Sequence, residues 1–308
     1  MKVLSEKFSQ LRNRFVSTIG VFDGVHKGHQ FILKKVIEKA QSKNISSLLI
    51  TFWPDPHIIL GKKFLGYLMS IESKIKVVSS LGIDYIFILD TNRNILNTSG
   101  DIFIRNIIER FSILELVVGE DFRFGEGAKW EIEELRHLAN LFKFKLTVVK
   151  KLSIDREIVS SSRIREFILD GEFKRAKIML GKDYFIETEV IKGSGLGRKI
   201  GYPTANCDWQ GFVIPKRGVY SAYVLFDGKL YLGAVNIGFK PTVNNQRKIS
   251  LEVHIIDFNE NIVGKKIKII FLEKIRREKK FSSLGKLAVS IRRDLEIIRK
   301  NKYGLPKI

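Results

Sequence analysis

The chain has 308 residues, of which 44% are hydrophobic, and its 54 lysines and arginines against 33 aspartates and glutamates give a formal charge of +21. Since one domain usually holds about 100–200 residues, the length predicts two domains. No stretch reaches the roughly 18 uninterrupted apolar residues of a membrane span, and Met1 to Lys7 lacks the apolar region of a secretory signal. We therefore expect a cytoplasmic protein without a membrane partner.

The positive charge could indicate a nucleic-acid-binding protein. The lysines, however, are spread over both halves of the chain and are not gathered into one stripe or tail. We therefore expect no nucleic-acid partner, and we interpret the charge as solvated surface that attracts anionic nucleotides. The single cysteine, Cys207, cannot form an internal disulfide, and its position in an expected strand predicts a buried packing residue.

The first half alternates short apolar runs with amphipathic stripes. The expected strands are Phe15 to Ile19, Ser47 to Phe52, Tyr85 to Leu89, Leu114 to Val118 and Phe144 to Val149. Between them lie two helical stripes, at Ile32 to Ala40 and at Ile71 to Leu81. Strands that alternate with helices predict parallel βαβ units, and therefore an α/β domain with a doubly wound sheet.

From about residue 184 the pattern changes to strands without convincing helices between them. The expected strands are Phe185 to Ile191, Val219 to Phe226, Leu230 to Ile237, Ser250 to Ile256 and Ile267 to Leu272. Asp227 and Gly228 join two of them, which is a strong hairpin signal, and a terminal helix follows at Leu284 to Ile298. The pattern predicts a small antiparallel β-barrel. We expect one domain at residues 1–183 and another at residues 184–308.

In the first half, His26 and His29 lie where a strand gives way to a helix. Two imidazoles three residues apart near a helix N-terminus can both face a phosphate, with the helix dipole and free N–H groups assisting. The spacing alone would equally suit a metal site or two surface histidines. The pair is therefore a candidate phosphate site.

In the second half, the segment from Gly193 to Asn206 (GSGLGRKIGYPTAN) places three glycines before a Pro-Thr-x-Asn unit. We expect these glycines to reach positive φ and to bring bare N–H groups to an anion. Thr204 and Asn206 fall on one face of an extended segment, and their oxygens suit Mg²⁺. The segment lacks the Gly-Lys-Ser/Thr of a P-loop, and Pro203 argues against a following helix. It predicts a magnesium-nucleotide site, although three glycines alone would favour an ordinary turn.

The glycine segment resembles the riboflavin kinase signature, and Gly20 to His29 (GVFDGVHKGH) resembles the adenylyltransferase motif of the bifunctional bacterial riboflavin kinase/FAD synthetase family. Further family blocks occur in the expected order, so the resemblance covers nearly the whole chain. They are TFWPDP from Thr51, VGEDFRFG from Val118, SSSRIR from Ser160, GAVNIG from Gly233, KPT from Lys240, EVH from Glu252 and RREKKF from Arg276. So many ordered matches are not expected by chance.

The resemblance implies a transferase with two activities: the barrel phosphorylates riboflavin to FMN with Mg-ATP, and a nucleotidyltransferase-like first domain adenylylates FMN to FAD. It implies catalytic roles for His26, His29 and Glu252, the last as the base for the ribityl hydroxyl. It implies ATP or phosphate binding by Gly20, Asp23, Gly24, Gly28, Ser160, Ser161, Ser162, Arg165, Gly193, Gly195, Gly197 and Arg198, and metal binding by Thr204 and Asn206. The isolated serines and arginine would also suit a helix cap and a solvated side chain.

The flavin-binding residues that the resemblance implies are Phe52, Pro54, Pro56, Asp121, Phe124, Arg276 and Phe281. For aromatic residues at strand ends, packing in the core is an equally good interpretation. The family usually has histidine where this chain has Asp55, and a basic-x-Gly-Asp run where it has Lys129 to Glu131. Two alternatives stay open: a kinase whose first domain has a different or lost transferase activity, and a nucleic-acid-binding or flavin-sensing protein without catalysis.

Overall fold

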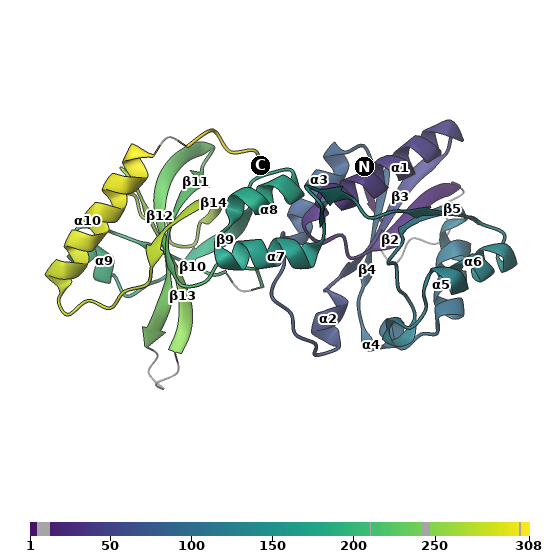
Figure 1. The fold of residues 1–308 in the computed structure, drawn as a ribbon, viewed down its shortest axis with the longest axis horizontal. Helices are drawn as coiled ribbons and strands as arrows, with labels where there is room; N and C mark the ends of the chain where they lie inside the picture. Colours follow the sequence, from purple (N-terminus) through teal and green to yellow (C-terminus); the bar gives the residue numbers. More distant parts are fainter. Residues whose placement is uncertain (5–12, 210, 242–246, 302) are drawn as a thin grey trace. The chain divides into compact units, whose positions relative to one another are not determined.

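The computed structural model describes residues 1–4, 13–209, 211–241, 247–301 and 303–308 (Figure 1). Contacts divide the chain into two compact units, the first with residues 1–64 and 71–160 and the second with residues 65–70 and 161–308. Helices α7 (Ser161–Asp170) and α8 (Phe173–Leu180) group with the second unit. The domain boundary predicted after residue 183 stays a prediction, because a grouping of contacts does not show which segments fold independently.

A parallel sheet with the order β1-β4-β3-β2-β5-β6 forms the centre of the first unit. Its strands are β1 (Lys2–Leu4), β2 (Phe15–Gly20), β3 (Ser46–Trp53), β4 (Tyr85–Asp90), β5 (Ile113–Gly119) and β6 (Lys145–Val149). The helices are α1 (Lys27–Ser42), α2 (Pro56–Ile59), α3 (Ile71–Ser80), α4 (Arg93–Leu96), α5 (Gly100–Phe111) and α6 (Ile132–Leu141), with 3₁₀ turns η1 (Asp23–Val25) and η2 (Glu126–Ala128) and a small hairpin of β7 (Ser153–Ile154) and β8 (Glu157–Ile158). The predicted doubly wound sheet is confirmed.

The strand order creates a topological switch point between β2 and β5. From β2 the chain continues through β3 and β4 towards one edge of the sheet, whereas from β5 it continues to β6 at the other edge. In open α/β sheets, ligands bind beyond the carboxyl ends of the strands at such a point. Residues that follow β2, β3 and β5, such as His26, Pro54 and Asp121, are therefore at the edge of the sheet where a ligand is expected.

A close contact in this unit depends on glycine at two positions. Helix α5 begins at Gly100, where a Cβ would lie 2.3 Å from the Trp130 ring, and a Cβ at Gly125 would lie 2.8 Å from the same ring. The Trp130 ring also packs on the buried Phe124 ring, with 5.9 Å between the centroids. Trp130, which departs from the family pattern, therefore fills space between two glycine backbones.

A closed antiparallel barrel with the order β10-β13-β12-β11-β14-β9 forms the centre of the second unit. Its strands are β9 (Phe185–Ile191), β10 (Ala205–Cys207), β11 (Gly218–Phe226), β12 (Lys229–Pro241), β13 (Arg247–Ile255) and β14 (Lys266–Arg277). Helix α10 (Leu284–Lys300) lies along the outside of the barrel, where Leu295 and Ile298 pack with Ile256 (Figure 1). The predicted barrel, the hairpin at Asp227-Gly228 and the terminal helix are confirmed.

The expectation of no helix between the barrel strands is wrong at one place. The short helix α9 (Leu196–Lys199) lies between β9 and β10. It ends before Pro203, so the proline is compatible with it, and the segment after the proline is extended as expected. In the described ranges, no helix is both long enough and apolar enough to cross a membrane.

Replacement of Gly100 by alanine is expected to destabilise the first unit, because the new methyl group would overlap the Trp130 ring. Overpacking of a filled core typically costs about 1–3 kcal/mol. Urea unfolding followed by near-UV circular dichroism measures the loss. Gly304→Ala is the matched control, since nothing lies within 4 Å of a Cβ at that position. Equal stability of the two variants would contradict the contact.

Candidate active sites

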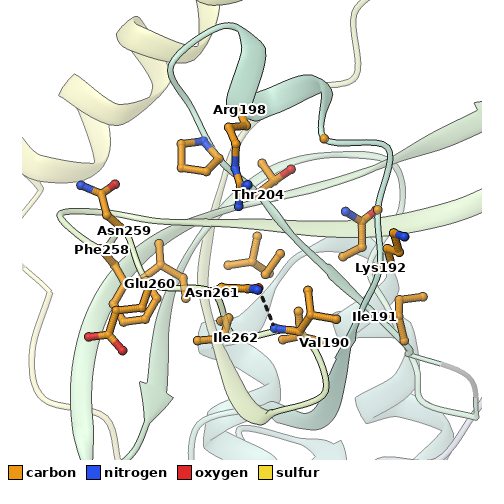
Figure 2. Close-up of a pocket in the computed structure, with 18 residues that line it drawn as sticks. Val190, Ile191, Lys192, Arg198, Thr204, Phe258, Asn259, Glu260, Asn261 and Ile262 are labelled. Atoms are coloured by element: carbon orange, nitrogen blue, oxygen red, sulfur yellow. Dashed lines mark hydrogen bonds between the residues drawn. The ribbon is translucent and has the colours of Figure 1, made fainter.

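Two cavities in the second unit meet at Thr204. The first, here named the Glu252 cavity, has a volume of about 490 Å³, and the second, the Asn206 cavity, has a volume of about 650 Å³. Thr204 lines both. Figure 2 shows the Asn206 cavity with Arg198 and Thr204 on one side and the segment Phe258–Ile262 across from them. The two cavities therefore lie on either side of the Thr204 side chain.

The register of the barrel brings the candidate metal ligands and the candidate base together. Asn206 of β10 lies directly opposite Glu252 of β13. The Thr204 hydroxyl donates a hydrogen bond to Oε2 of Glu252 over 3.2 Å. Because alternate residues of an extended segment share a face, Thr204 and Asn206 lie on the same side. Three oxygen-bearing side chains thus converge where the two cavities meet.

His254, two residues after Glu252, supports the chain that leads into β10. Its Nδ1 lies 2.8 Å from the carbonyl oxygen of Pro203. Its ring packs edge-on against Tyr202, with 5.7 Å between the ring centroids. These contacts indicate a structural role for His254.

Only one of the three glycines in the segment has the positive φ that the sequence predicts. Gly195 has a positive φ of 72°, but Gly193 and Gly197 are not in the left-handed region, so the expectation of positive φ is wrong for these two. A Cβ at Gly193 would lie 1.9 Å from Nδ2 of Asn206, and a Cβ at Gly197 would lie 2.3 Å from the Tyr202 carbonyl oxygen. At both positions glycine is required because neighbouring atoms come too close for a side chain.

The remaining barrel candidates divide between the two cavities. Arg198 lines the Asn206 cavity, whereas Arg276 and Phe281 line the Glu252 cavity. The Arg276 guanidinium also forms a bidentate ion pair with Asp294 of α10, with N–O distances of 2.8 to 3.0 Å. Arg276 therefore connects the barrel wall to the terminal helix at the rim of this cavity.

Sequence reasoning missed several residues that line these cavities. The segment Phe258–Val263 forms one side of the Asn206 cavity, and Asn236 and Lys279 line the Glu252 cavity. The segment Phe258–Val263 is a connection between strands, and its letters match no binding motif. Asn236 could have been identified from the sequence, since it lies inside the GAVNIG block. Thr242 of the KPT block lies outside the described residues.

In the first unit, His26 caps helix α1. Its Nδ1 accepts a hydrogen bond from the backbone N–H of His29 over 3.3 Å, and the two rings stack with 3.6 Å between their centroids. Since Nδ1 is the acceptor, a neutral His26 ring carries its proton on Nε2. A Cβ at Gly28 would lie 3.2 Å from the His26 ring. The pair thus lies at the positive end of a 16-residue helix.

The other adenylyltransferase candidates lie in two segments of the chain, residues 20–24 and residues 160–165. Gly20 is the last residue of β2, Asp23 and Gly24 form η1, and Asp23 is only 3% exposed. Ser160 follows Val159, whose carbonyl oxygen lies 3.6 Å from where a Gly28 Cβ would be. Ser161, Ser162 and Arg165 belong to α7 in the second unit, where Nε of Arg165 donates to the Gly66 carbonyl over 2.9 Å.

The flavin candidates of the first unit differ in exposure. Phe52, Pro54 and Pro56 are half-buried at the end of β3, whereas Phe124 is 5% exposed and belongs to the hydrophobic core. The Asp121 carboxylate is exposed and pairs with Lys151 over 3.3 Å. The structure thus supports the core interpretation for Phe124, and a flavin contact there stays a prediction.

Sequence comparisons match the two halves of the chain to two families. The FAD synthetase family matches residues 8–163, and the riboflavin kinase family matches residues 180–302. A bifunctional riboflavin kinase/FMN adenylyltransferase of Buchnera aphidicola is 36% identical over 92% of this chain and 92% of its own length. The chain belongs to the bifunctional riboflavin kinase/FMN adenylyltransferase family. The family member of Escherichia coli K12 is 32% identical over 95% of this chain and 94% of its own length.

A crystal structure with a similar fold is known. A protein from Streptococcus pneumoniae described as a macrolide-efflux protein is 28% identical, with a TM-score of 0.84 and coverage of 96% of this chain and 97% of its own. The shared family confirms the resemblance that the ordered motifs indicate.

Cys207, next to Asn206, is expected to resist thiol reagents in the folded protein. Burial, assisted by the Glu252 charge, raises the pKa of its thiol to about 12, so roughly one part in 10⁴ is thiolate at pH 8. Titration with a chromogenic disulfide at pH 8 should detect no reactive thiol until a denaturant is added, and then one per chain. Rapid reaction of the native protein would contradict the buried position.

Proposed function

We propose that this chain phosphorylates riboflavin to FMN with ATP and then transfers AMP from a second ATP to FMN, which forms FAD and releases pyrophosphate. The barrel performs the first reaction and the α/β domain performs the second. The observation that carries the kinase reaction is the meeting of the two cavities at Thr204, beside Glu252. The adenylyl transfer rests on the His26–His29 pair at the N-terminus of α1. Riboflavin, FMN, FAD and ATP are the ligands, and we expect the protein to act in the cytoplasm without nucleic acid.

In the kinase reaction, riboflavin occupies the Glu252 cavity and ATP occupies the Asn206 cavity, with its phosphates along the glycine segment. The 5′-hydroxyl oxygen attacks the γ-phosphorus, ADP leaves, and Glu252 accepts the hydroxyl proton. The hydrogen bond from Thr204 to Glu252 orients the carboxylate. Because little covalent chemistry is required of the protein, alignment and charge stabilisation supply most of the rate enhancement.

The donor set at the junction of the cavities fits magnesium. Thr204 and Asn206 offer a hydroxyl and an amide oxygen, and Mg²⁺ is usually held by one or two protein oxygens together with phosphates and water. Among the residues that the structure describes, no cluster of three histidine, cysteine or acidic side chains exists. A nucleotide-borne Mg²⁺, held by Thr204 and Asn206, therefore suits this site better than a metal held by protein alone. It would neutralise charge on the transferring phosphoryl group.

In the adenylyl transfer, an FMN phosphate oxygen attacks the α-phosphorus of ATP. His26 and His29, at the N-terminus of α1, donate to the phosphates and stabilise the charge that develops. Gly28 leaves room for the His26 ring, from which a Cβ at this position would lie only 3.2 Å. Ser160, which belongs to the same unit as His26, is proposed to contact the leaving pyrophosphate. Phe52, Pro54 and Pro56 are proposed as a wall of the flavin site.

One assay tests the whole proposal. Purified protein is incubated with riboflavin and ATP, with Mg²⁺ or with a chelator, and the products are separated by chromatography. FMN and FAD should both form with Mg²⁺, and neither with the chelator. FMN without FAD would support the alternative of a first domain with a different activity, and no flavin product would support the non-catalytic alternatives.

Glu252→Gln should abolish FMN formation and preserve FAD formation from supplied FMN. The amide retains the size of the side chain but cannot accept the hydroxyl proton, and a general base typically contributes roughly 10²–10⁴-fold. Initial rates of both reactions in the same preparation give the measurement. Riboflavin phosphorylation near the wild-type rate would show that Glu252 is not the base.

His29→Ala should have the opposite effect, with FAD synthesis lost and FMN accumulating. The substitution removes a donor directed at charge in the transition state, which typically costs on the order of 10²–10³-fold. The readout is the ratio of FMN to FAD at fixed ATP, with circular dichroism to verify folding. Glu252→Gln serves as the matched control, since with supplied FMN it should form FAD at the wild-type rate.

A further inference from the structure

The turn that carries His26 has a strained backbone. Phe22, Gly24 and Val25 have positive φ values of 50°, 77° and 41°. This region is unfavourable for a β-branched residue such as Val25, and such conformations persist only where the surrounding structure holds them. Near the end of the turn, the Gln30 amide donates to the Val25 carbonyl over 2.8 Å.

A buried lysine holds the start of the same turn. Lys74 of α3 is 1% exposed, and its Nζ donates to the Val21 carbonyl over 2.7 Å and to Oγ1 of Thr51 over 3.2 Å. The Thr51 hydroxyl donates to the same carbonyl over 2.9 Å. Lys74 therefore connects α3 to the carboxyl ends of β2 and β3, directly before the turn.

Two buried carboxylates interact with this ammonium group. Asp23 of η1 is 3% exposed, and Asp55, which precedes α2 and contacts the His57 ring over 2.8 Å, is 4% exposed. Burial lowers the pKa of Lys74 to about 8, and Asp23 and Asp55 oppose this shift. A neutral lysine would leave two negative charges at the edge of the sheet where anionic phosphates are proposed to bind.

We propose that Lys74 is a positioning residue for adenylyl transfer, which holds the turn from Val21 to His26 and neutralises the carboxylates of Asp23 and Asp55. This role rests on the proposed function of the first domain. The kinase reaction uses residues of the barrel, so it serves as an internal control in the same chain.

The test compares Lys74→Met, which removes the charge and the donor, with Lys76→Met, which removes an exposed lysine from the same helix. We expect Lys74→Met to lower kcat for FAD formation at least about tenfold, with a smaller effect on KM and with FMN formation unchanged. Lys76→Met should retain both rates. FAD formation by a folded Lys74→Met within about twofold of wild type would overturn the positioning role. Absence of FAD formation by the wild type would instead overturn the proposed function.

A pH profile decides the question if Lys74→Met does not fold. Lys74 is charged below its pKa and neutral above it, so kcat/KM of the wild type for FAD formation should fall above about pH 8. Lys74→Arg keeps its charge and should lack this decline, and FMN formation by the wild type should not share it. A wild-type profile for FAD formation that stays flat up to about pH 10 would overturn the role.

Discussion

Both candidate sites contain a glycine whose backbone packs closely against a functional side chain. In the barrel, the bare backbone of Gly193 lies against the Asn206 amide, and that of Gly197 lies against the Tyr202 carbonyl. In the α/β unit, Gly28 lies against the His26 ring. These contacts fix the positions of Asn206 and His26 without any ligand. A site formed in advance needs less reorganisation when the substrate binds.

The sequence predicts the fold where its side-chain pattern is strong. The central strands of the α/β unit are mainly apolar, as strands buried on both faces require, although Ser17 and Thr18 interrupt the apolar run of β2. The strands β2 and β3 match the predicted ranges within one residue at each end. The β11–β12 hairpin follows from Asp227 and Gly228, whose φ values of 47° and 73° are both positive, as a two-residue turn of this kind requires. The candidate site residues were found because most of them lie in contiguous blocks.

The remaining site residues have no local signal. Lys74 lies in an amphipathic helix, and a lysine on such a helix is normally exposed, so its burial beneath the His26 turn follows only from the packing of α3 against η1. The segment Phe258–Val263 connects the end of β13 to the start of β14, and its position as a cavity wall follows from the closed barrel and not from a local motif. The expectation of positive φ at Gly193 and Gly197 was wrong. The spacing of the glycines shows that these positions need glycine, but it does not show whether the requirement comes from the φ angle or from close neighbouring atoms.

The two departures from the family pattern are matched by contacts within the first unit. Trp130 is accommodated because Gly100 and Gly125 leave room for its ring. Asp55 accepts hydrogen bonds from the His57 backbone over 2.9 Å and lies 2.8 Å from Nδ1 of the His57 ring. A buried carboxylate without a cation nearby would be strongly destabilising, and Lys74 supplies that charge. Asp55 and Lys74 thus interact electrostatically, and the lysine offsets the negative charge that the aspartate adds near the proposed phosphate site.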